Sequence, residues 1–347
     1  CRNLSKQEVT ERLSAENKHI IRFKMPSKKI SFTDLVKGKL EFDTALIGDI
    51  AIAKSVSIPL YNFAVVVDDF EMKITHVIRG EDHISNTPKQ IALFEALDFS
   101  IPEFAHLPLI LGSDRSKMSK RDGATSIIEY KETGFLPEAL INFIALLGWN
   151  PGDNREIFSL EELVSEFSVE RIQKSGAIFN IQKLESINSY YIKNKPIEEL
   201  TKLCEPYFEK AGLKIGFEKL KKIVKLEQER IKRLSEILEV SKLFFEETDY
   251  APEILVWKKS DKATAIKALQ IVLAEFEKIN DADFSMDRLK PILDSIITKF
   301  GGAGEVFWPF RVALSGQQSS PPPLEIAEIL GKNESLTRIQ VAINKLI

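Results

Sequence analysis

A short basic loop is the part of this chain whose residue types and spacing are best suited to chemistry. The segment Lys117-Met118-Ser119-Lys120-Arg121 places three cations among small or flexible residues. Turn-forming residues frame it, Gly112, Ser113 and Asp114 before it and Asp122 and Gly123 after it. Because ammonium groups suit phosphate oxygens whose charge changes during a reaction, the pattern predicts a loop that closes on a polyphosphate. For a basic pentamer taken alone, the alternative is a solvated surface cluster.

A second set of polar residues lies upstream, around the expected ends of two strands. The apolar run 64–67 is rich in β-branched residues and predicts a strand covered on both faces. A second predicted strand, Val77-Ile78, ends in Arg79-Gly80-Glu81-Asp82. Since ligands in open α/β sheets gather at the carboxyl ends of strands, a substrate site is expected there, with Arg79 as its cation. The alternative is a structural ion pair of Arg79 with Asp68, Glu81 or Asp82.

The basic loop and the segments 61–69 and 75–83 together resemble the class I glutamyl-tRNA synthetases of the bacterial type. Their residues, order and spacing carry the resemblance, which covers essentially the whole chain. The loop alone indicates class I synthetases in general, and the upstream segments indicate the glutamate and glutamine branch. The resemblance implies a glutamate–tRNA ligase, which activates L-glutamate with ATP to glutamyl-AMP and transfers it to the 3′ end of tRNA(Glu) in protein synthesis.

The resemblance also implies roles for the residues singled out above. The loop 117–121 would bind ATP, accompanied by Mg²⁺, and Lys117 and Lys120 would stabilise charge on the leaving pyrophosphate. Tyr61 and Arg79 would bind glutamate, with the Tyr hydroxyl orienting the ligand and the guanidinium neutralising a carboxylate. Val65 stands where some relatives have Asn, which leaves one polar contact to the substrate open.

The expected fold is a Rossmann-like α/β half-domain of the class I synthetase type, followed by a mostly α-helical region. Residues 1–55 are expected to end the insertion that contacts the acceptor end of tRNA. Residues 56–125 are expected to form the second half of the catalytic domain, with the basic loop. Residues 126–196 are assigned to a stem-contact region, and residues 197–347 to an α-helical anticodon-binding region.

Local patterns predict several elements inside these segments. Capping boxes with hydrophobic staples start helices at Ser5 and Ser159. Apolar spacing predicts helices over 87–97 and 218–243, and a helix that is buried almost all round over 137–148. Strands are predicted at 20–24 and 30–32, and a proline-rich turn at 319–323.

Contacts with RNA bases are expected from the helical region. The run 307–311 includes Trp308 and Arg311, and aromatic rings and guanidinium groups stack on unpaired bases. The same run is also consistent with a corner of the core. The resemblance places Arg230 and Arg311 near the anticodon. The basic side chains of 218–243 mostly lie off its apolar face, and such a face is usually only solvated.

Composition narrows the functional classes. A net charge of −3 over 347 residues excludes a generally basic nucleic-acid binder, so any RNA contact must come from local patches. No apolar run approaches the ~20 residues that span a bilayer, and no signal-peptide pattern is found, so a cytoplasmic monomer without membrane contact is expected. Two cysteines make no disulfide framework. By resemblance Cys1 is a candidate zinc ligand, although Asn3 stands where a His ligand sometimes follows, and the alternative is an inert cysteine.

The His-x-Gly-His type motif of class I synthetases is not found in the sequence. None of the four histidines has the required glycine after it. The chain is therefore expected to lack the first half of the catalytic domain and to be incompetent by itself. Two rivals stay open: a catalytically inactive tRNA-binding protein descended from a synthetase, and an enzyme that glutamylates a modified tRNA base. Charging of tRNA(Gln) beside tRNA(Glu) also stays open.

Overall fold

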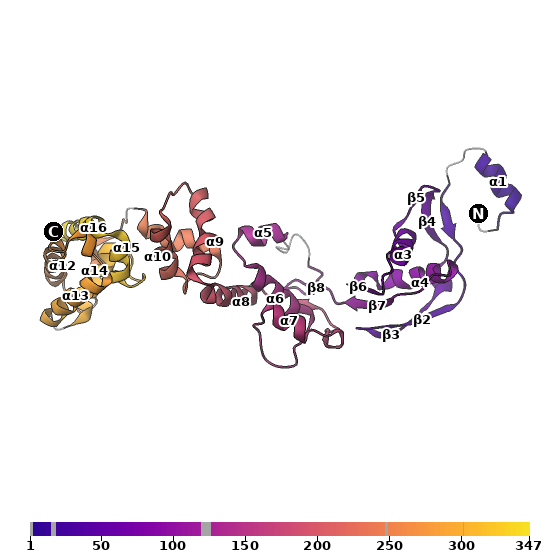
Figure 1. Ribbon diagram of the computed structural model, residues 1–347, viewed down its shortest axis with the longest axis horizontal. Helices are drawn as coiled ribbons and strands as arrows, with labels where there is room; N and C mark the ends of the chain where they lie inside the picture. Colours follow the sequence, from indigo (N-terminus) through magenta and orange to yellow (C-terminus); the bar gives the residue numbers. More distant parts are fainter. Residues whose placement is uncertain (1–2, 15–18, 119–125, 247–248, 301) are drawn as a thin grey trace. The chain divides into compact units, whose positions relative to one another are not determined.

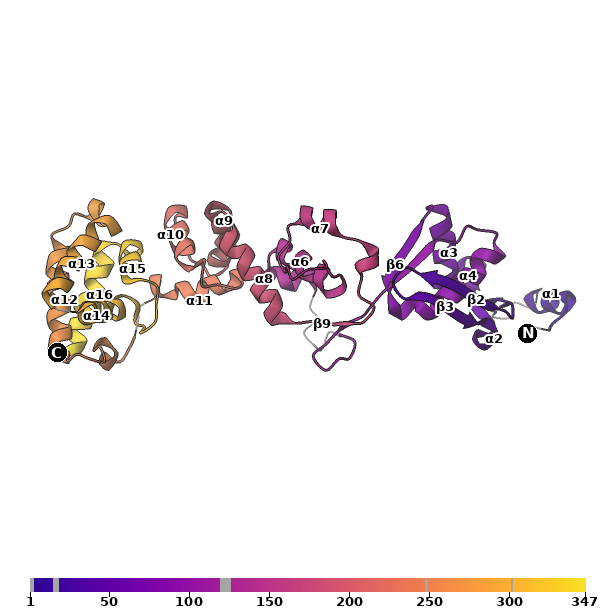
Figure 2. The same cartoon turned by 90° about the horizontal axis from the view of Figure 1, so that it is seen from below.

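A computed structural model of the protein describes residues 3–14, 19–118, 126–246, 249–300 and 302–347. The chain divides into two compact units, one of residues 1–125 and 140–183 and one of residues 126–139 and 184–347. The first unit contains β-sheets, and the second is built from helices (Figures 1 and 2). In the described ranges, no helix is long and apolar enough to cross a membrane. The expected α/β half-domain followed by a helical region is confirmed.

A four-stranded mixed sheet in the order β3-β2-β7-β6 organises the first unit. Strand β7 runs parallel to both β2 and β6, and β2 pairs with β3 in the antiparallel sense. Because β2, β7 and β6 are parallel, their carboxyl ends meet at one edge of the sheet, where ligands gather in such folds. The strands are β2 (Lys29–Asp34), β3 (Gly38–Asp43), β6 (His76–Gly80) and β7 (Glu103–Leu107).

Two helices, α3 (Tyr61–Glu71) and α4 (Thr87–Ala96), pack against each other beside the sheets. The apolar run 64–67 lies inside α3, so the strand predicted there is wrong. Val66 of this run is buried against Leu93 and Phe94 of α4. A short apolar run has no period that separates a buried strand from a buried helix, and helix packing here overrides the β-propensity of its valines.

A second, antiparallel sheet has the order β1-β4-β5, and α3 contacts it through β4. The capping box predicted at Ser5 is confirmed: the Ser5 N–H donates to the Glu8 carboxylate at 2.8 Å, and the Glu8 N–H donates to the Ser5 hydroxyl at 3.2 Å. The elements are α1 (Lys6–Ser14), β1 (Ile21–Phe23), α2 (Thr44–Ile47), β4 (Ile50–Ser55) and β5 (Ile58–Pro59).

The rest of the first unit holds a small parallel pair of strands and two helices. The capping box predicted at Ser159 is confirmed at the start of α7. In α6, Phe143 is buried, but Ile141 and Ile144 are 44% and 48% exposed, so the prediction of a helix buried almost all round is wrong. The elements are η1 (Glu81–Asn86), β8 (Ile110–Leu111), α6 (Pro137–Gly148), α7 (Leu160–Glu166), η3 (Val169–Arg171) and β9 (Ala177–Ile178).

In the second unit, the long helix predicted over 218–243 is interrupted. Helix α10 ends at Glu227, and helical structure resumes only at Leu234. Hydrogen bonds from distant residues hold the intervening segment: Asn188 donates to the Lys232 carbonyl at 2.6 Å, and Gln228 donates to the Ile192 carbonyl at 2.9 Å. Because no glycine or proline marks the break, the periodicity alone did not reveal it. The elements are α5 (Ile127–Glu132), α8 (Ile181–Asn194), α9 (Ile197–Lys210), α10 (Phe217–Glu227), η4 (Leu234–Glu236), α11 (Ile237–Ser241) and η5 (Lys242–Phe244).

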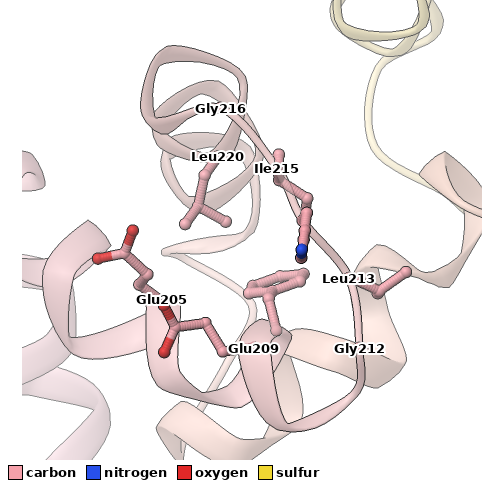
Figure 3. A pocket seen from close by; sticks show the side chains of 9 residues that line it. Glu205, Glu209, Gly212, Leu213, Ile215, Gly216 and Leu220 are labelled. Atoms are coloured by element: carbon pink, nitrogen blue, oxygen red, sulfur yellow. The ribbon is translucent and has the colours of Figure 1, made fainter.

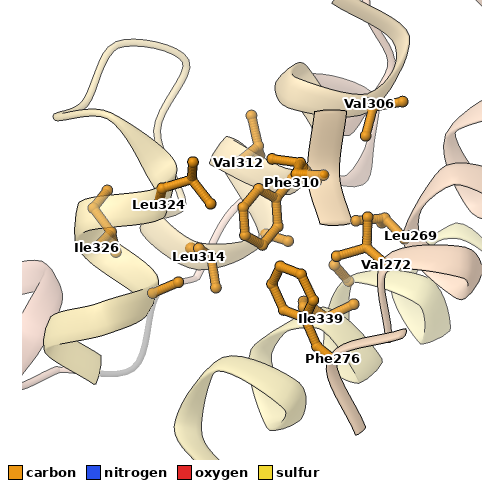
Figure 4. Close-up of a cluster of buried hydrophobic side chains, with 14 of the residues drawn as sticks. Leu269, Val272, Phe276, Val306, Phe310, Val312, Leu314, Leu324, Ile326 and Ile339 are labelled. Atoms are coloured by element: carbon orange, nitrogen blue, oxygen red, sulfur yellow. The ribbon is translucent and has the colours of Figure 1, made fainter. Parts of the chain in front are cut away.

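The last helices surround a large apolar core (Figure 4). Phe276 of α12 and Phe310 of α14 meet edge to face at its centre, with ring centroids 5.6 Å apart. The proline turn predicted at 319–323 is confirmed, since α15 begins at Pro323. The elements are η6 (Pro252–Leu255), α12 (Lys262–Glu277), η7 (Asp281–Asp283), α13 (Met286–Phe300), α14 (Ala303–Ser315), α15 (Pro323–Leu330) and α16 (Lys332–Leu346).

Candidate active site

Arg79 lies at the edge of the sheet where the parallel strands end. It faces His106 of β7 in the strand register, and its Nε donates to His106 Nε2 at 3.2 Å. Helix α4 supplies two further acceptors for Nη2, the Thr87 hydroxyl at 2.9 Å and the Gln90 side-chain oxygen at 2.8 Å. All three partners are neutral acceptors, so they orient the guanidinium without cancelling its charge.

Two of the three carboxylates expected as alternative partners of Arg79 are engaged elsewhere. Glu81 pairs with Lys37, and Asp82 lies 3.0 Å from the ammonium of Lys117. Over the residues that the structure describes, no ion pair joins Arg79 to a carboxylate. The structural ion pair considered for Arg79 therefore does not form, and its charge remains available to a ligand.

Tyr61 and Arg79, the two residues that the resemblance assigns to glutamate, lie beside each other. Burial lowers the pKa of Arg79, while the Tyr61 hydroxyl and the charge of Asp69 oppose that effect. An arginine keeps its proton in a protein, so the side chain is a fixed cation. Tyr61 is 51% exposed, and its ring lies 5.7 Å from the ring of His83. A half-buried guanidinium beside an exposed phenol can bind and orient a carboxylate.

The basic loop begins beside the same strand end. The Met118 N–H donates to the Ile110 carbonyl at 3.0 Å, which folds the loop back along β8. The ammonium of Lys117 donates to the Asp82 carboxylate at 3.0 Å, and this hydrogen bond lowers the pKa of Asp82. Asp82 lies two residues beyond the end of β6, so the loop and the carboxylate-binding candidates share one neighbourhood. The other predicted loop residues, Ser119, Lys120 and Arg121, lie outside the described residues.

Comparison with known proteins assigns the chain to a family. Residues 1–186 match the catalytic domain of the class I tRNA synthetases (E and Q), and residues 199–343 match an anticodon binding domain. The chain belongs to the class I tRNA synthetases. A glutamate–tRNA ligase of Caldicellulosiruptor saccharolyticus is 45% identical over 98% of this chain and 71% of that protein. One of Carboxydothermus hydrogenoformans is 42% identical over 99% of this chain and 73% of that protein.

Solved structures agree with this assignment. The crystal structure of a glutamate tRNA ligase from Elizabethkingia meningosepticum, in complex with its amino acid, matches with a TM-score of 0.88 and 32% identity. That match covers 100% of this chain and 72% of the other. The glutamate-tRNA synthetase of Elizabethkingia anophelis matches with a TM-score of 0.86, also at 32% identity, over 99% of this chain and 72% of that one.

The synthetase site contains residues that the sequence reasoning missed. His106 is fully buried beside Arg79, and its Nδ1 lies 2.6 Å from a carboxylate oxygen of Asp34 at the end of β2. Gln90, which accepts from Arg79, donates in turn to the Asn62 side-chain oxygen at 3.1 Å. No motif marks these residues, because they come from four separate elements. The only available signal was the position of Asp34 just before a tight turn.

The predicted anticodon contacts lie in the second unit of the synthetase. Arg230 pairs at 2.8 Å with Glu227, whose pKa burial raises. Trp308 is half-buried and donates its indole N–H to the Ile254 carbonyl at 2.8 Å. Phe310 is fully buried, so the core alternative holds for that ring. The buried Nε of Arg311 has no hydrogen bond partner in the described part of the chain. Base contact by Arg230, Trp308 and Arg311 stays a prediction.

The predicted zinc ligand Cys1 lies outside the described residues. Within the described residues, no group of three or more His, Cys, Asp or Glu side chains is placed to hold a metal ion. The other cysteine, Cys204, is fully buried, and burial raises the pKa of its thiol to about 12. A thiol in this environment is an inert core residue.

A hollow in the second unit lies between α9 and α10 (Figure 3). Phe208, Leu213 and Leu220 form much of its wall, and Glu205 and Glu209 stand at its side. None of its polar lining groups is a buried atom without a partner. The hollow contains none of the predicted site residues.

Proposed function

We propose that this protein acts as a glutamate–tRNA ligase. The observation that carries the proposal is Arg79, a half-buried cation at the carboxyl end of β6 whose acceptors are all neutral. A pocket for glutamate needs a fixed cation for each carboxylate that it desolvates, because an unpaired buried charge is costly. Relatives named glutamate–tRNA ligase align with 98–99% of the chain at 42–45% identity, which supports the same substrate.

The reaction then has two displacements. A carboxylate oxygen of glutamate attacks the α-phosphorus of ATP, and the bond to pyrophosphate breaks, which gives glutamyl-AMP. A hydroxyl of the terminal ribose of tRNA next attacks the glutamyl carbonyl carbon, loses its proton and displaces AMP. No protein nucleophile is needed, so the protein contributes by positioning and by stabilising charge.

The residues divide this work by their chemistry. Arg79 and Tyr61 bind and orient glutamate. Lys117 and Lys120 stabilise the negative charge that develops on pyrophosphate, together with the Mg²⁺ that accompanies ATP, and Met118, Ser119 and Arg121 complete the phosphate-binding loop. Lys117 has to leave Asp82 to reach the phosphates, and an exposed ion pair breaks at little cost.

The segments divide the contacts with tRNA(Glu). We place the acceptor-end contact in residues 1–55, the catalytic half in 56–125, the stem contact in 126–196 and the anticodon contact in 197–347. In the last segment Arg230, Arg311 and Trp308 are the proposed base contacts, since stacking on guanidinium and indole groups suits unpaired bases.

ATP–pyrophosphate exchange by the full protein, with tRNA present, tests this function across a panel of amino acids. Exchange that depends on glutamate and not on aspartate, glutamine or arginine supports it. Robust tRNA binding without exchange for any amino acid would favour the inactive, synthetase-derived alternative. Each assay should include Arg79→Leu, which removes the proposed carboxylate-binding cation.

A further inference from the structure

A buried carboxylate and a buried imidazole stand directly behind Arg79. Asp34 is 1% exposed and His106 is fully buried, and Asp34 Oδ2 lies 2.6 Å from His106 Nδ1. The other oxygen of Asp34 accepts the N–H groups of Val36 at 3.0 Å, Lys37 at 2.8 Å and His106 at 3.2 Å. The carboxylate is therefore fixed by the turn between β2 and β3 and by the backbone of β7.

These bonds decide which nitrogen of His106 carries its proton. Burial alone raises the pKa of Asp34, but the hydrogen bonds from Lys37, His106 and Val36 together lower it below its usual value. An ionised carboxylate is only an acceptor, so His106 Nδ1 has to donate. Burial lowers the pKa of His106 and keeps the ring neutral. Its Nε2 then carries a lone pair, which is what the Nε–H of Arg79 needs at 3.2 Å.

The guanidinium of Arg79 is held from three sides. Nε donates to His106, and the two N–H groups of Nη2 donate to Thr87 and Gln90. The two N–H groups of Nη1 make none of these three bonds. Because a guanidinium is planar, fixing Nε and Nη2 also fixes the direction of Nη1. The site is therefore oriented before a carboxylate arrives, which reduces the cost of binding.

We propose that Asp34 and His106 are positioning residues for glutamate recognition, with Asp34 setting the tautomer of His106 and His106 aiming the guanidinium of Arg79. This inference rests on the proposed function, in which Arg79 binds a carboxylate of glutamate. Asp34 stands in the chain well before the segment that supplies Arg79, and it reaches the site because β2 lies beside β7 in the sheet.

The change Asp34→Asn reverses the hydrogen bonding without changing the shape of the side chain. The amide oxygen can still accept the turn N–H groups, but the amide nitrogen then faces His106 Nδ1 and donates to it. His106 has to carry its proton on Nε2, where it opposes the Nε–H of Arg79. Hydrogen bonds to charged groups contribute ~1.5–3 kcal/mol, which corresponds to roughly 10- to 100-fold in affinity. We expect glutamate to bind that much more weakly and ATP to bind with unchanged affinity.

Two substitutions at His106 separate positioning from packing. Gln places an oxygen near the former Nε2 and can accept from Arg79, whereas Met has a similar volume and no acceptor of comparable strength. We expect His106→Gln to retain glutamate affinity within about threefold and His106→Met to lose roughly 10- to 100-fold. We also expect His106→Gln to rescue Asp34→Asn, because the glutamine needs no tautomer. The control is His76→Gln, at an exposed histidine on β6.

The readouts are calorimetric titration of the full protein with glutamate and with ATP, thermal unfolding, and ¹⁵N NMR of the unmodified protein. The NMR spectrum should show His106 protonated at Nδ1. A proton on Nε2, or equal glutamate affinity of the Gln and Met variants, overturns the positioning role. Native glutamate affinity of Arg79→Leu overturns the proposed role of Arg79 instead. If Arg79→Leu loses glutamate affinity but Asp34→Asn keeps native glutamate affinity, the role of Arg79 stands. The positioning role of Asp34 and His106 is then overturned.

Discussion

The ammonium of Lys117 lies 3.0 Å from the carboxylate of Asp82, so an exposed ion pair joins the basic loop to the segment that follows β6. The two side chains are 61% and 44% exposed, and such pairs contribute little to stability. The same lysine is a proposed ligand of the ATP phosphates. We therefore propose that Asp82 competes with ATP for Lys117.

Removing that competitor should favour ATP. We expect Asp82→Asn to leave the thermal midpoint unchanged and to lower the KM for ATP about two- to fivefold at low ionic strength, with less effect at 1 M salt, where the Debye length is ~3 Å. The control is Glu41→Gln, which removes another exposed pair, with Lys29. An unchanged KM for ATP at low salt would show that the ion pair does not restrain the loop.

Lys120→Ala tests the basic loop itself. If Lys120 stabilises the leaving pyrophosphate, its loss removes one donor from the transition state and costs roughly 2.7–4 kcal/mol of barrier. ATP–pyrophosphate exchange with tRNA present should fall on the order of 100-fold, while the unfolding transition stays in place. Lys54→Ala, an exposed lysine on β4, is the control. Native exchange by Lys120→Ala would exclude this role.

Arg79→Leu tests the glutamate pocket. A bound carboxylate left without its cation loses ~1.5–3 kcal/mol, or more if it stays desolvated, so glutamate affinity should drop at least 10- to 100-fold. ATP affinity should stay near native. Arg22→Ala, at the exposed position of β1, serves as the control for loss of an arginine. Arg79→Lys keeps the charge but not the planar fork, so we expect an intermediate affinity.

The neutral state of His106 predicts a dependence of stability on pH. Burial lowers the pKa of His106 below its usual 6.5. At pH values between the folded pKa and 6.5, the unfolded chain therefore binds more protons than the folded chain. Stability is fully present above pH ~6.5 and falls as the pH drops through the folded pKa. The charged or titratable groups that face the ring are Asp34 on β2, Arg79 on β6 and His83 on η1.

Urea unfolding at pH 7.5 and pH 5.5 measures this effect. From pH 7.5 to pH 5.5 the unmodified protein should lose more free energy of unfolding than His106→Gln, because the glutamine side chain does not titrate. Equal losses in both proteins would mean that His106 is charged in the folded state or exchanges protons freely.

Gly134 is the clearest structural constraint in the second unit. Its φ is +91°, and a Cβ there would lie 2.4 Å from the backbone nitrogen of Leu234. Gly134→Ala should therefore destabilise the protein by ~2 kcal/mol or more, through strain and through the lost hydrogen bond from Leu234 to the Gly134 carbonyl at 3.0 Å. Gly216→Ala is the control, since nothing lies within 4 Å of its Cβ position. Thermal unfolding of both variants measures the difference.

The features that the sequence predicted well are local. The capping boxes at Ser5 and Ser159 depend on residues three apart, and the predicted helix over 87–97 closely matches α4. Arg79 was expected near the end of a strand and lies near the end of β6, while its role in binding glutamate stays a prediction. For such features the hydrogen bonds or the periodicity lie within a few residues of the pattern that predicts them.

The features that it predicted poorly depend on tertiary contacts. The valines of 64–67 favour a strand by their β-propensity. They lie in helix α3 instead, because Val66 is buried there against α4. The break after Glu227 is held by Asn188 and Gln228, which pair with residues more than 30 positions away. Asp34 and His106 are 72 residues apart and meet only because their strands lie side by side. No pattern in a single sequence predicts that two such distant residues will pair.

Charging of tRNA tests the central claim most directly. Purified tRNA(Glu) and tRNA(Gln) should be incubated with labelled glutamate, ATP and the full protein, and the charged product should be separated on an acid gel. The account predicts glutamyl-tRNA(Glu) that requires ATP and is lost in Arg79→Leu but not in Arg22→Ala. Absence of glutamyl-tRNA with either tRNA, or equal charging by Arg79→Leu, would contradict it.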